Sequence, residues 1–370
     1  MNFARIPTLG SVILRLLLMF VLGASALAQA TAHSVSNTKI NACRPDTKSR
    51  FGIVSAFGAE ADLLVAQTSK RRRCLINGNM FTTGTLEGNA VVIVLTGQSL
   101  ENAAMITQLL IDRFKVHHLI LSGIAGGLGD ANHVGDVVVP EKWALPFEGY
   151  WSNSSEVPAP CGAPGDLACM GEKLSSHTNT PDSDYQVRSP GGDVGTGLFM
   201  RDTFVMTAAN SPRGEFKFDY AVDPEMLRIA RTLKPDLERC GPKNPSLCVP
   251  TQPRLVVGGR GITLSTFLAN SNYREYLSRT LGAISVDMET TSFAHVAYAN
   301  GIPFLAFRAL SDQAGGSDNK DVAAFFGSGL AEENESRVTL AFLQAWAQMY
   351  PRQAGHRRVN ATRQAPRRTP

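Results

Sequence analysis

The chain has 370 residues, of which 44% are hydrophobic and 18% are charged. This composition is that of a globular protein with a sizeable core, and the length allows one large domain or two ordinary ones. The formal net charge of +4 comes from the two ends, since the first 30 residues hold two arginines and residues 351–370 hold six, with no acidic residue in either segment. The body between them is acidic on balance. The basic pI therefore does not indicate that the protein binds nucleic acid.

The first 30 residues have the pattern of a secretory signal peptide. Arg5 and Arg15 lie near the start, an apolar stretch covers Leu16–Leu27, and Ala28–Gln29–Ala30 forms an A-x-A cleavage site. The stretch is too short and wrongly flanked for a membrane anchor, although an uncleaved anchor helix stays open as the alternative. No later stretch is long enough to span a bilayer. We therefore expect an exported protein, either periplasmic or secreted.

An even number of cysteines follows this segment, which in an exported chain indicates disulfides. Two pairs enclose Pro/Gly-rich loops of equal length, which local disulfides would close at the neck, and the third pair would then join the remaining two residues. The expected pairs are Cys161 with Cys169, Cys240 with Cys248, and Cys43 with Cys74. The sequence leaves this connectivity open. No histidine lies near these cysteines at zinc-ligand spacing, so we expect no metal site.

Strands alternate with helices along most of the chain. We expect strands at 51–57, 90–96, 117–122, 134–139, 254–258, 262–266, 283–286 and 303–308, and helices at 59–67, 100–114, 224–233, 272–281, 287–300, 322–326 and 333–350. Residues 74–86 have the pattern of a hairpin, and the basic run Arg71–Arg73 is interpreted as a solvated loop. This alternation predicts an α/β fold over residues 31–350, with three α/β/α layers and a mixed, twisted sheet.

Two segments differ from this pattern. Residues 151–193 are dominated by Ser, Asn, Pro, Gly and Asp without periodicity, which predicts an inserted surface excursion or a lid. Residues 351–370 are rich in Pro and Arg and are also aperiodic, which predicts a disordered tail. A weak tether to a polyanion is the alternative interpretation of the tail.

The most informative stretch is 283–312, because its polar residues are concentrated at strand ends. Asp287, Glu289, Arg308, Ser311 and Asp312 all fall at a strand end or in a first helical turn. In open α/β sheets, ligands bind in the crevice beyond the carboxyl ends of the strands. Asp287 could be only an N-cap and Glu289 only a first-turn acid. Two carboxylates and an arginine gathered at one edge nevertheless predict a site.

Two further features lie at predicted strand ends. Glu60 falls in the first turn of the helix after strand 51–57. The glycine-rich turn 123–127, GIAGG, follows strand 117–122 and would let a ligand approach the backbone closely. Its spacing is not that of a dinucleotide site, and a simple tight turn is the alternative.

Four blocks of the sequence, taken together, resemble the nucleoside phosphorylase/nucleosidase family, and most closely its methylthioadenosine/S-adenosylhomocysteine nucleosidase branch. In chain order they are FGIVSAFGAEADLL, LILSGIAGGLGDANHVGDVVVP, LFMRDTFV and VDMETTSFAHVAYANGIPFLAFRALSD. The segment with Trp143 and Trp151 is also similar to the secreted, bark-storage-like relatives. The resemblance implies a homodimeric hydrolase that cleaves purine nucleosides with water and needs no cofactor.

The resemblance also implies a role for each site residue. Asp312 would protonate the leaving purine, so burial must raise its pKa, and Ser311 would orient it. Glu60 would activate the attacking water, with Arg308 beside it. The implied substrate-binding residues are Glu289 and Met288 at the ribose, Phe204 and Val205 at the base, and Ile124, Ala125 and Gly126 in the glycine turn.

The sequence departs from the family pattern in places that leave alternatives open. Ile124 stands where the nucleosidases often have Ser. The arginines that phosphorylases use for phosphate are missing before the first helix and before the glycine turn, which favours water as the nucleophile. A purine nucleoside phosphorylase and a non-catalytic nucleoside-binding or storage protein remain the alternatives. The residues of the alkylthio pocket, around Phe57 and Phe325–Phe326, are not assigned.

Overall fold

The computed structural model describes residues 43, 46–146, 148–153, 169–172, 196–200, 202–207, 211–316 and 319–351. The predicted signal peptide, most of the 151–193 insertion and the tail beyond residue 351 lie outside the described residues.

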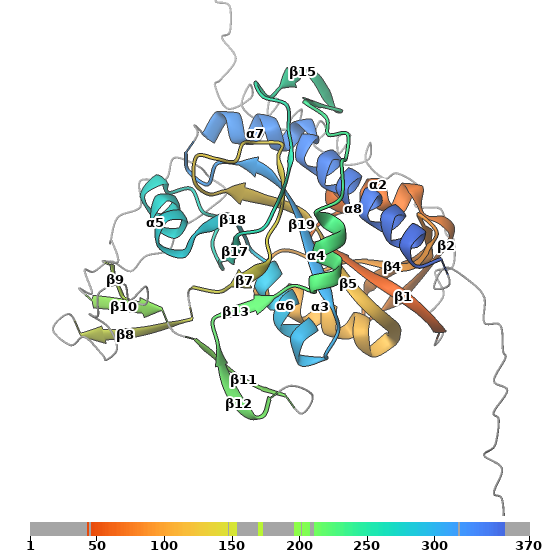
Figure 1. Cartoon of the computed structure of the whole chain (residues 1–370), viewed down its shortest axis with the longest axis horizontal. Helices are drawn as coiled ribbons and strands as arrows, with labels where there is room; N and C mark the ends of the chain where they lie inside the picture. The colour runs from red at the N-terminus through yellow and green to blue at the C-terminus, as the bar shows by residue number, and fades with distance from the viewer. Residues whose placement is uncertain are drawn as a thin grey trace, which may run out of the picture. The chain divides into compact units, whose positions relative to one another are not determined.

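A mixed sheet of twelve strands forms the middle layer and is built around the long strand β5 (Phe114–Gly127) (Figure 1). β5 pairs in parallel with β1 (Asp46–Ser55) and β19 (Phe304–Asp312), and antiparallel with β18 (Ala283–Asp287). β1 also pairs in parallel with β4 (Asn89–Leu95). The other strands of the sheet are β2 (Ser69–Ile76), β3 (Asn79–Leu86), β6 (Val137–Val139), β7 (Lys142–Ala144), β13 (Asp219–Ala221), β16 (Leu255–Val257) and β17 (Arg260–Thr263).

Helices cover both faces of this sheet (Figure 1). α2 (Gly58–Gln67) and α8 (Leu330–Met349) pack against each other on one face, and α3 (Leu100–Arg113) and α6 (Thr290–Ala299) pack against each other on the opposite face. The remaining helices are α4 (Pro224–Ala230), α5 (Ser271–Leu281) and α7 (Asn319–Ser328). The predicted fold class, three α/β/α layers with a mixed sheet, is confirmed.

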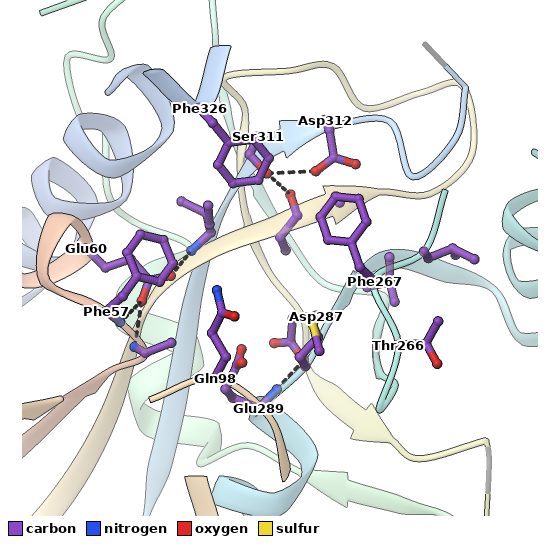
Figure 2. Close-up of a pocket in the computed structure, with 17 residues that line it drawn as sticks. Phe57, Glu60, Gln98, Thr266, Phe267, Asp287, Glu289, Ser311, Asp312 and Phe326 are labelled. Carbon is purple, nitrogen blue, oxygen red and sulfur yellow. Dashed lines mark hydrogen bonds between the residues drawn. The ribbon is translucent and has the colours of Figure 1, made fainter. Parts of the chain in front are cut away.

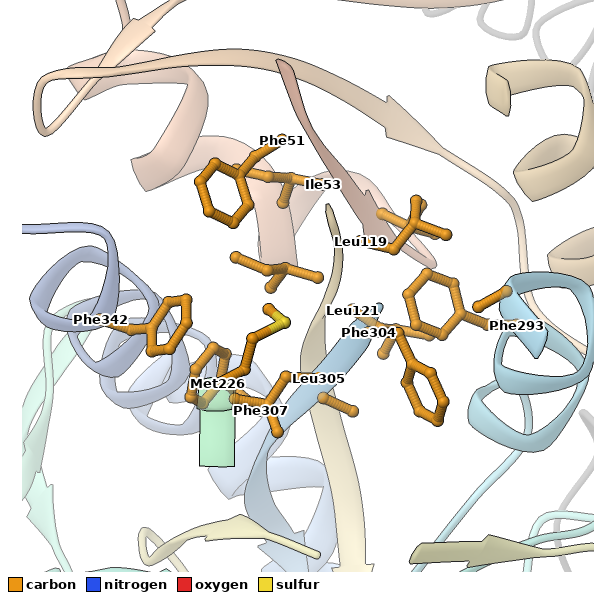
Figure 3. Close-up of a cluster of buried hydrophobic side chains, with 14 of the residues drawn as sticks. Phe51, Ile53, Leu119, Leu121, Met226, Phe293, Phe304, Leu305, Phe307 and Phe342 are labelled. Carbon is orange, nitrogen blue, oxygen red and sulfur yellow. The ribbon is translucent and has the colours of Figure 1, made fainter. Parts of the chain in front are cut away.

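The hydrophobic core lies on both faces of the central strands (Figure 3). Along β19, Phe304 meets Phe293 of α6 with ring centroids 5.9 Å apart, and Phe307 meets Phe342 of α8 at 5.3 Å on the other face. Each fully buried aromatic side chain contributes about 1.5–3 kcal/mol. Because both faces are covered, β19 is apolar without alternation until it reaches Arg308. The charged residues therefore fall at the end of a strand that the core holds rigidly.

Small sheets lie outside the main one. β8 (Gly149–Asn153), β9 (Cys169–Glu172) and β10 (Thr196–Met200) form one of them, so the described parts of the 151–193 insertion contain strands that its composition does not suggest. The two-stranded units are β11 (Thr203–Thr207) with β12 (Ser211–Lys217), and β14 (Cys240–Gly241) with β15 (Asn244–Cys248).

Two of the predicted disulfides are present. Cys43 is bonded to Cys74 of β2, and Cys240 is bonded to Cys248 across the β14–β15 hairpin. The third predicted pair includes Cys161, which lies outside the described residues. Among the described residues, none of the helices is both long and apolar enough to cross a membrane.

Three local predictions are wrong. Arg71–Arg73 is not a loop but part of β2, whose exposed basic side chains suit an edge strand. Residues 123–127 are not a turn but the end of β5, because β19 and β18 pair with them. α6 begins at Thr290 rather than Asp287, which stays in β18.

Candidate active site

A pocket opens where β1, β5, β18 and β19 end (Figure 2). It is lined by eight of the residues proposed from the sequence, namely Glu60, Ile124, Ala125, Gly126, Met288, Glu289, Ser311 and Asp312. Glu60 lies at one side with Phe57, and Asp312 lies at the other side with Phe267 (Figure 2). The strand order brings these residues together although Glu60 and Asp312 are 252 positions apart in the chain.

Glu60 is almost fully buried, and backbone N–H groups hold its carboxylate. Oε2 accepts hydrogen bonds from the N–H of Ala56 at 2.6 Å and of Phe57 at 3.3 Å, and Oε1 accepts one from Ile124 at 2.8 Å. α2 starts directly after β1, so a first-turn side chain can reach back to the strand end. Burial raises the pKa of Glu60 to about 7, while Arg308 and these N–H groups oppose the rise. A carboxylate with this pKa is suited to general-base catalysis near neutral pH.

Arg308 on β19 is fully buried and lies beneath three carboxylates. Its Nε donates to Asp287 Oδ2 at 2.7 Å, and its Nη2 donates to Glu289 Oε2 at 2.9 Å. Its Nη1 lies 3.7 Å from Glu60 Oε1. A Cβ atom on Gly123 would lie 2.3 Å from Nη1 and 2.4 Å from Glu60 Oε1, so this contact requires glycine. One guanidinium therefore fixes the relative positions of these carboxylates.

Asp287 and Glu289 have different roles, one in capping a helix and one in the pocket. Asp287 Oδ1 accepts hydrogen bonds from the N–H of Thr290 at 3.2 Å and from Thr263 Oγ1 at 2.7 Å, so its carboxylate supports the start of α6. Glu289 occupies the N-cap position, but its side chain makes no capping bond. Its Oε1 accepts instead from the N–H of Ser99 at 2.9 Å. Burial raises the pKa of Glu289, which Arg308 opposes.

Asp312 is buried, and hydrogen bonds from Ala314 and Ser311 hold its side-chain oxygens. Its Oδ1 accepts from the N–H of Ala314 at 2.7 Å, and its Oδ2 lies 2.8 Å from Ser311 Oγ, which lies 3.2 Å from Ala125 O. Ser311 has a single hydroxyl hydrogen. The Ser311 hydroxyl donates to Asp312 Oδ2 and to Ala125 O, so these two acceptors share its hydrogen. Burial raises the pKa of Asp312, while the bonds from Ala314 and Ser311 oppose the rise.

Phe204 and Val205, which the family resemblance places at the base, are not among the residues that line this pocket. Phe204 lies on the β11–β12 hairpin, is 51% exposed and contacts Phe216, with the rings tilted by 58° and their centroids 5.1 Å apart. Val205 is buried in the main core. The block LFMRDTFV contains an aromatic residue in a strand, but the hairpin directs that strand away from the site.

Several residues that the sequence reasoning missed line the pocket instead. They are Ala56, Gln98, Thr266, Phe267, Leu268 and Val286, and Asp287, which the sequence placed in the polar cluster without a role in substrate binding, also lines it. Thr266, Phe267 and Leu268 follow β17, which lies next to β18 in the sheet. The available signal was another apolar strand that ends in a short polar segment before a helix. Phe57 and Phe326, which lay in the unassigned alkylthio region, add apolar surface to the pocket (Figure 2).

The arrangement suits acid–base chemistry on a partly apolar ligand. It offers a carboxyl group with a pKa of about 7 in Glu60, a second carboxyl group with a raised pKa in Asp312, and aromatic side chains in the same pocket. No group of His, Cys, Asp and Glu residues among the described residues has the geometry of a metal site.

Comparisons with known proteins show the family of the chain. Residues 50–344 match the family described as the Phosphorylase superfamily. The chain is 26% identical over 268 residues to a 5′-methylthioadenosine/S-adenosylhomocysteine nucleosidase of Listeria innocua, covering 71% of this chain and 86% of the relative. It is also 26% identical over 262 residues to bark storage protein A of Populus deltoides, covering 68% of this chain and 74% of the relative.

Solved structures show the same fold. The 5′-methylthioadenosine/S-adenosylhomocysteine nucleosidase of S. pneumoniae superposes with a TM-score of 0.53 at 21% identity, covering 80% of this chain and 99% of that one. Futalosine hydrolase of Helicobacter pylori superposes with a TM-score of 0.52 at 17% identity, covering 82% of this chain and 98% of that one. With the family match spanning most of the sequence, the chain belongs to the phosphorylase superfamily.

Proposed function

We propose that this protein is a purine nucleoside hydrolase that cleaves the N-glycosidic bond of 5′-methylthioadenosine, S-adenosylhomocysteine or similar nucleosides. The observation that carries the proposal is the placement of Glu60 and Asp312, two buried carboxyl groups with raised pKa values, in one pocket. Two carboxyl groups placed in this way can supply a base and an acid to one reaction. Relatives named as nucleosidases support the same substrate class.

The proposed reaction breaks the C1′–N9 bond and adds water across it. Asp312 gives its proton to N7 of the purine, so the base leaves as a neutral molecule rather than as an anion. Glu60 takes a proton from a water molecule, and the resulting hydroxide bonds to C1′. The products are the free purine and the 5-substituted ribose. Transfer of a proton from Glu60 to Asp312 through solvent restores both groups.

Other residues of the pocket would position the nucleoside. Glu289 accepts hydrogen bonds from the ribose hydroxyls, and Met288 packs against the sugar. Phe267 stacks on the purine in place of Phe204. Phe57 and Phe326 provide an apolar wall for a 5′-alkylthio group, which is why we favour thioether nucleosides.

Water is the proposed nucleophile because the site has no cation left for phosphate. Arg308, the buried cation of the site, already faces Asp287, Glu289 and Glu60. The N–H groups of Ala56 and Ile124 that would bind an anion are already bonded to the carboxylate of Glu60. A phosphate dianion beside Glu60 would also be repelled.

A non-catalytic nucleoside-binding or storage protein is the second candidate. It is favoured by the similarity to bark storage protein A and by the apolar side chain of Ile124 beside Glu60. This candidate and the hydrolase share the ligand and differ in turnover.

Export and a homodimer belong to the same proposal. Export is supported by the signal-like first 30 residues and by two disulfides, which persist in oxidising compartments. The dimer rests on the family resemblance. Light scattering after size exclusion should give twice the chain mass, and mass spectrometry of the exported protein should place the new N-terminus after Ala30.

The deciding experiment measures purine release from methylthioadenosine, adenosine and inosine, with and without phosphate. Release without phosphate, fastest for methylthioadenosine, is the expected result. Release only with phosphate would make the protein a phosphorylase. Binding of all three without release would support the storage protein.

A further inference from the structure

We infer that Arg274 on α5 is a positioning residue for Asp312, linking the loop that carries this acid to the segment that carries Phe267. The inference rests on the proposed function, because it takes Asp312 as the proton donor. Arg274 is only 8% exposed, yet it does not line the pocket and nothing in the mechanism so far uses it.

The guanidinium of Arg274 reaches two segments that end at the site. Its Nε donates to O of Gly127, the last residue of β5, at 3.3 Å, and its Nη2 donates to Gly129 O and, at 3.2 Å, to Asp130 Oδ1, both just beyond that strand. The same Nη2 donates to Gln313 Oε1 at 3.0 Å. Since Gln313 follows Asp312 directly, this bond fixes the backbone next to the acid.

Gln313 is held from its other end as well. Its Nε2 donates to Asn132 O at 3.0 Å, so this side-chain amide bridges Arg274 and the segment after β5. Both polar atoms of the amide are therefore occupied. A glutamine held in this way has little freedom to let the neighbouring backbone move.

The loop after Asp312 has a backbone that needs such support. Ala314 has φ of +49° and Gly315 has φ of +95°, both in the left-handed region. This conformation costs a non-glycine residue about 1–2 kcal/mol and persists only where the surroundings hold it. The N–H of Ala314 is the donor to Asp312 Oδ1. A relaxation of Ala314 would therefore remove a hydrogen bond from the acid itself.

The pocket residues Phe267 and Leu268 lie just before α5 in the chain. Its N-cap, Asn270, follows Phe267 and Leu268 closely in the chain. A Cβ atom on Gly315 would lie 2.3 Å from Asn270 N, so the acid loop and the base-facing segment are in backbone contact. Arg274 thus connects the Asp312 loop to α5, the helix that follows Phe267 in the chain. This connection sets the distance between the purine stacked on Phe267 and the proton donor Asp312.

The test uses a substrate whose leaving group needs no proton. Turnover of methylthioadenosine should fall about 10²-fold in Arg274→Gln, as expected for a misplaced catalytic group. Turnover of 4-nitrophenyl 5-methylthio-β-ribofuranoside should fall less than about threefold, because nitrophenolate leaves as an anion without acid catalysis. Asp312→Asn should show the same contrast. Arg279→Gln is the matched control, since Arg279 lies on the same helix, 79% exposed, and pairs with Glu275.

Three outcomes would overturn the inference. Equal losses on both substrates would mean that Arg274 only stabilises the fold, and unchanged turnover of methylthioadenosine would mean that it positions nothing. A crystal structure of Arg274→Gln with Gln313 and Ala314 undisplaced would contradict it independently of any substrate. Absence of wild-type turnover on methylthioadenosine would instead overturn the proposed function, a result that the variant does not influence.

Discussion

Arg308 Nη1 and Glu60 Oε1 lie 3.7 Å apart with both side chains buried, and the missing side chain of Gly123 makes this approach possible. The guanidinium is also bonded to Asp287 and Glu289. Its single positive charge is therefore shared among three carboxylates, and burial keeps the pKa of Glu60 high in spite of it. Burial is therefore the main cause of the raised pKa of Glu60, and the shared guanidinium opposes it only in part.

Replacing Glu60 with Gln should lower kcat about 10²-fold or more, because an amide cannot accept a proton from water. Glutamine has nearly the same shape, so binding of methylthioadenosine by calorimetry should change little. Turnover close to that of the wild type would remove Glu60 from the mechanism.

The pH dependence of activity should have an acidic limb near pH 7. The pKa of Glu60 is raised by burial to about 7, so its basic form appears as the pH rises through this value. A plot of kcat/KM against pH should therefore rise through pH 7, and a flat profile between pH 5 and 8 would contradict this assignment.

The raised pKa of Glu60 has the opposite effect on stability, because the folded state holds the proton more tightly than the unfolded state. The contribution of this proton to the free energy of unfolding is complete below pH 4.5 and is lost as the pH rises through 7. Thermal unfolding of Glu60→Gln should show a weaker decline of Tm over this range.

Replacing Asp312 with Asn should lower turnover of methylthioadenosine by about 10²–10⁴-fold, because asparagine has no acidic proton to give the purine. The contacts with Ser311 and Ala314 use positions that an amide also fills, so the fold should persist. Circular dichroism and nucleoside binding serve as controls. Turnover within a few fold of wild type would assign proton donation to another group.

Two phenylalanines provide a matched test of the base-binding wall. Phe267→Ala should raise KM for methylthioadenosine, since stacking of a base on an aromatic ring is worth about 1–3 kcal/mol. Phe204→Ala should leave KM unchanged, because Phe204 lies on the β11–β12 hairpin outside the pocket. The reverse result would restore the assignment made from the sequence.

Gly123→Ala should reduce both stability and activity. The new methyl group would meet Arg308 and Glu60 at less than van der Waals distance, and overpacking of this kind costs about 1–3 kcal/mol. Gly327→Ala is the control, because no atom lies within 4 Å of its Cβ position. Denaturant unfolding compares the two, and equal midpoints would show that the site relaxes around the methyl group.

The sheet and most of the site could be predicted because their signals are local. Apolar runs such as β19 mark central strands, and charged residues at the ends of such runs mark the site edge. The end of β5 was misinterpreted because Gly123, Gly126 and Gly127 indicate a turn locally, whereas pairing with β18 and β19 extends the strand. Pairing with neighbouring strands thus overrides the local preference of these glycines for a turn.

The base-facing residues could not be assigned, because their position depends on strand order. Phe204 lies within a segment with strand character, and Phe267 closely follows another. Only the placement of β17 beside β18 shows that Phe267 returns to the pocket. The hydrogen bond from Arg274 to Gly127 could not be predicted from the sequence either, since 147 positions separate the two residues.

Strand β2 has a consequence for how copies of this chain can meet. It is the last strand at its edge of the sheet, and Lys70–Arg73 places consecutive exposed basic side chains along it. Two such edges brought together would place like charges opposite each other, which disfavours growth of one sheet onto another. The edge is thus protected against aggregation. A homodimer would have to form through a different surface of the domain.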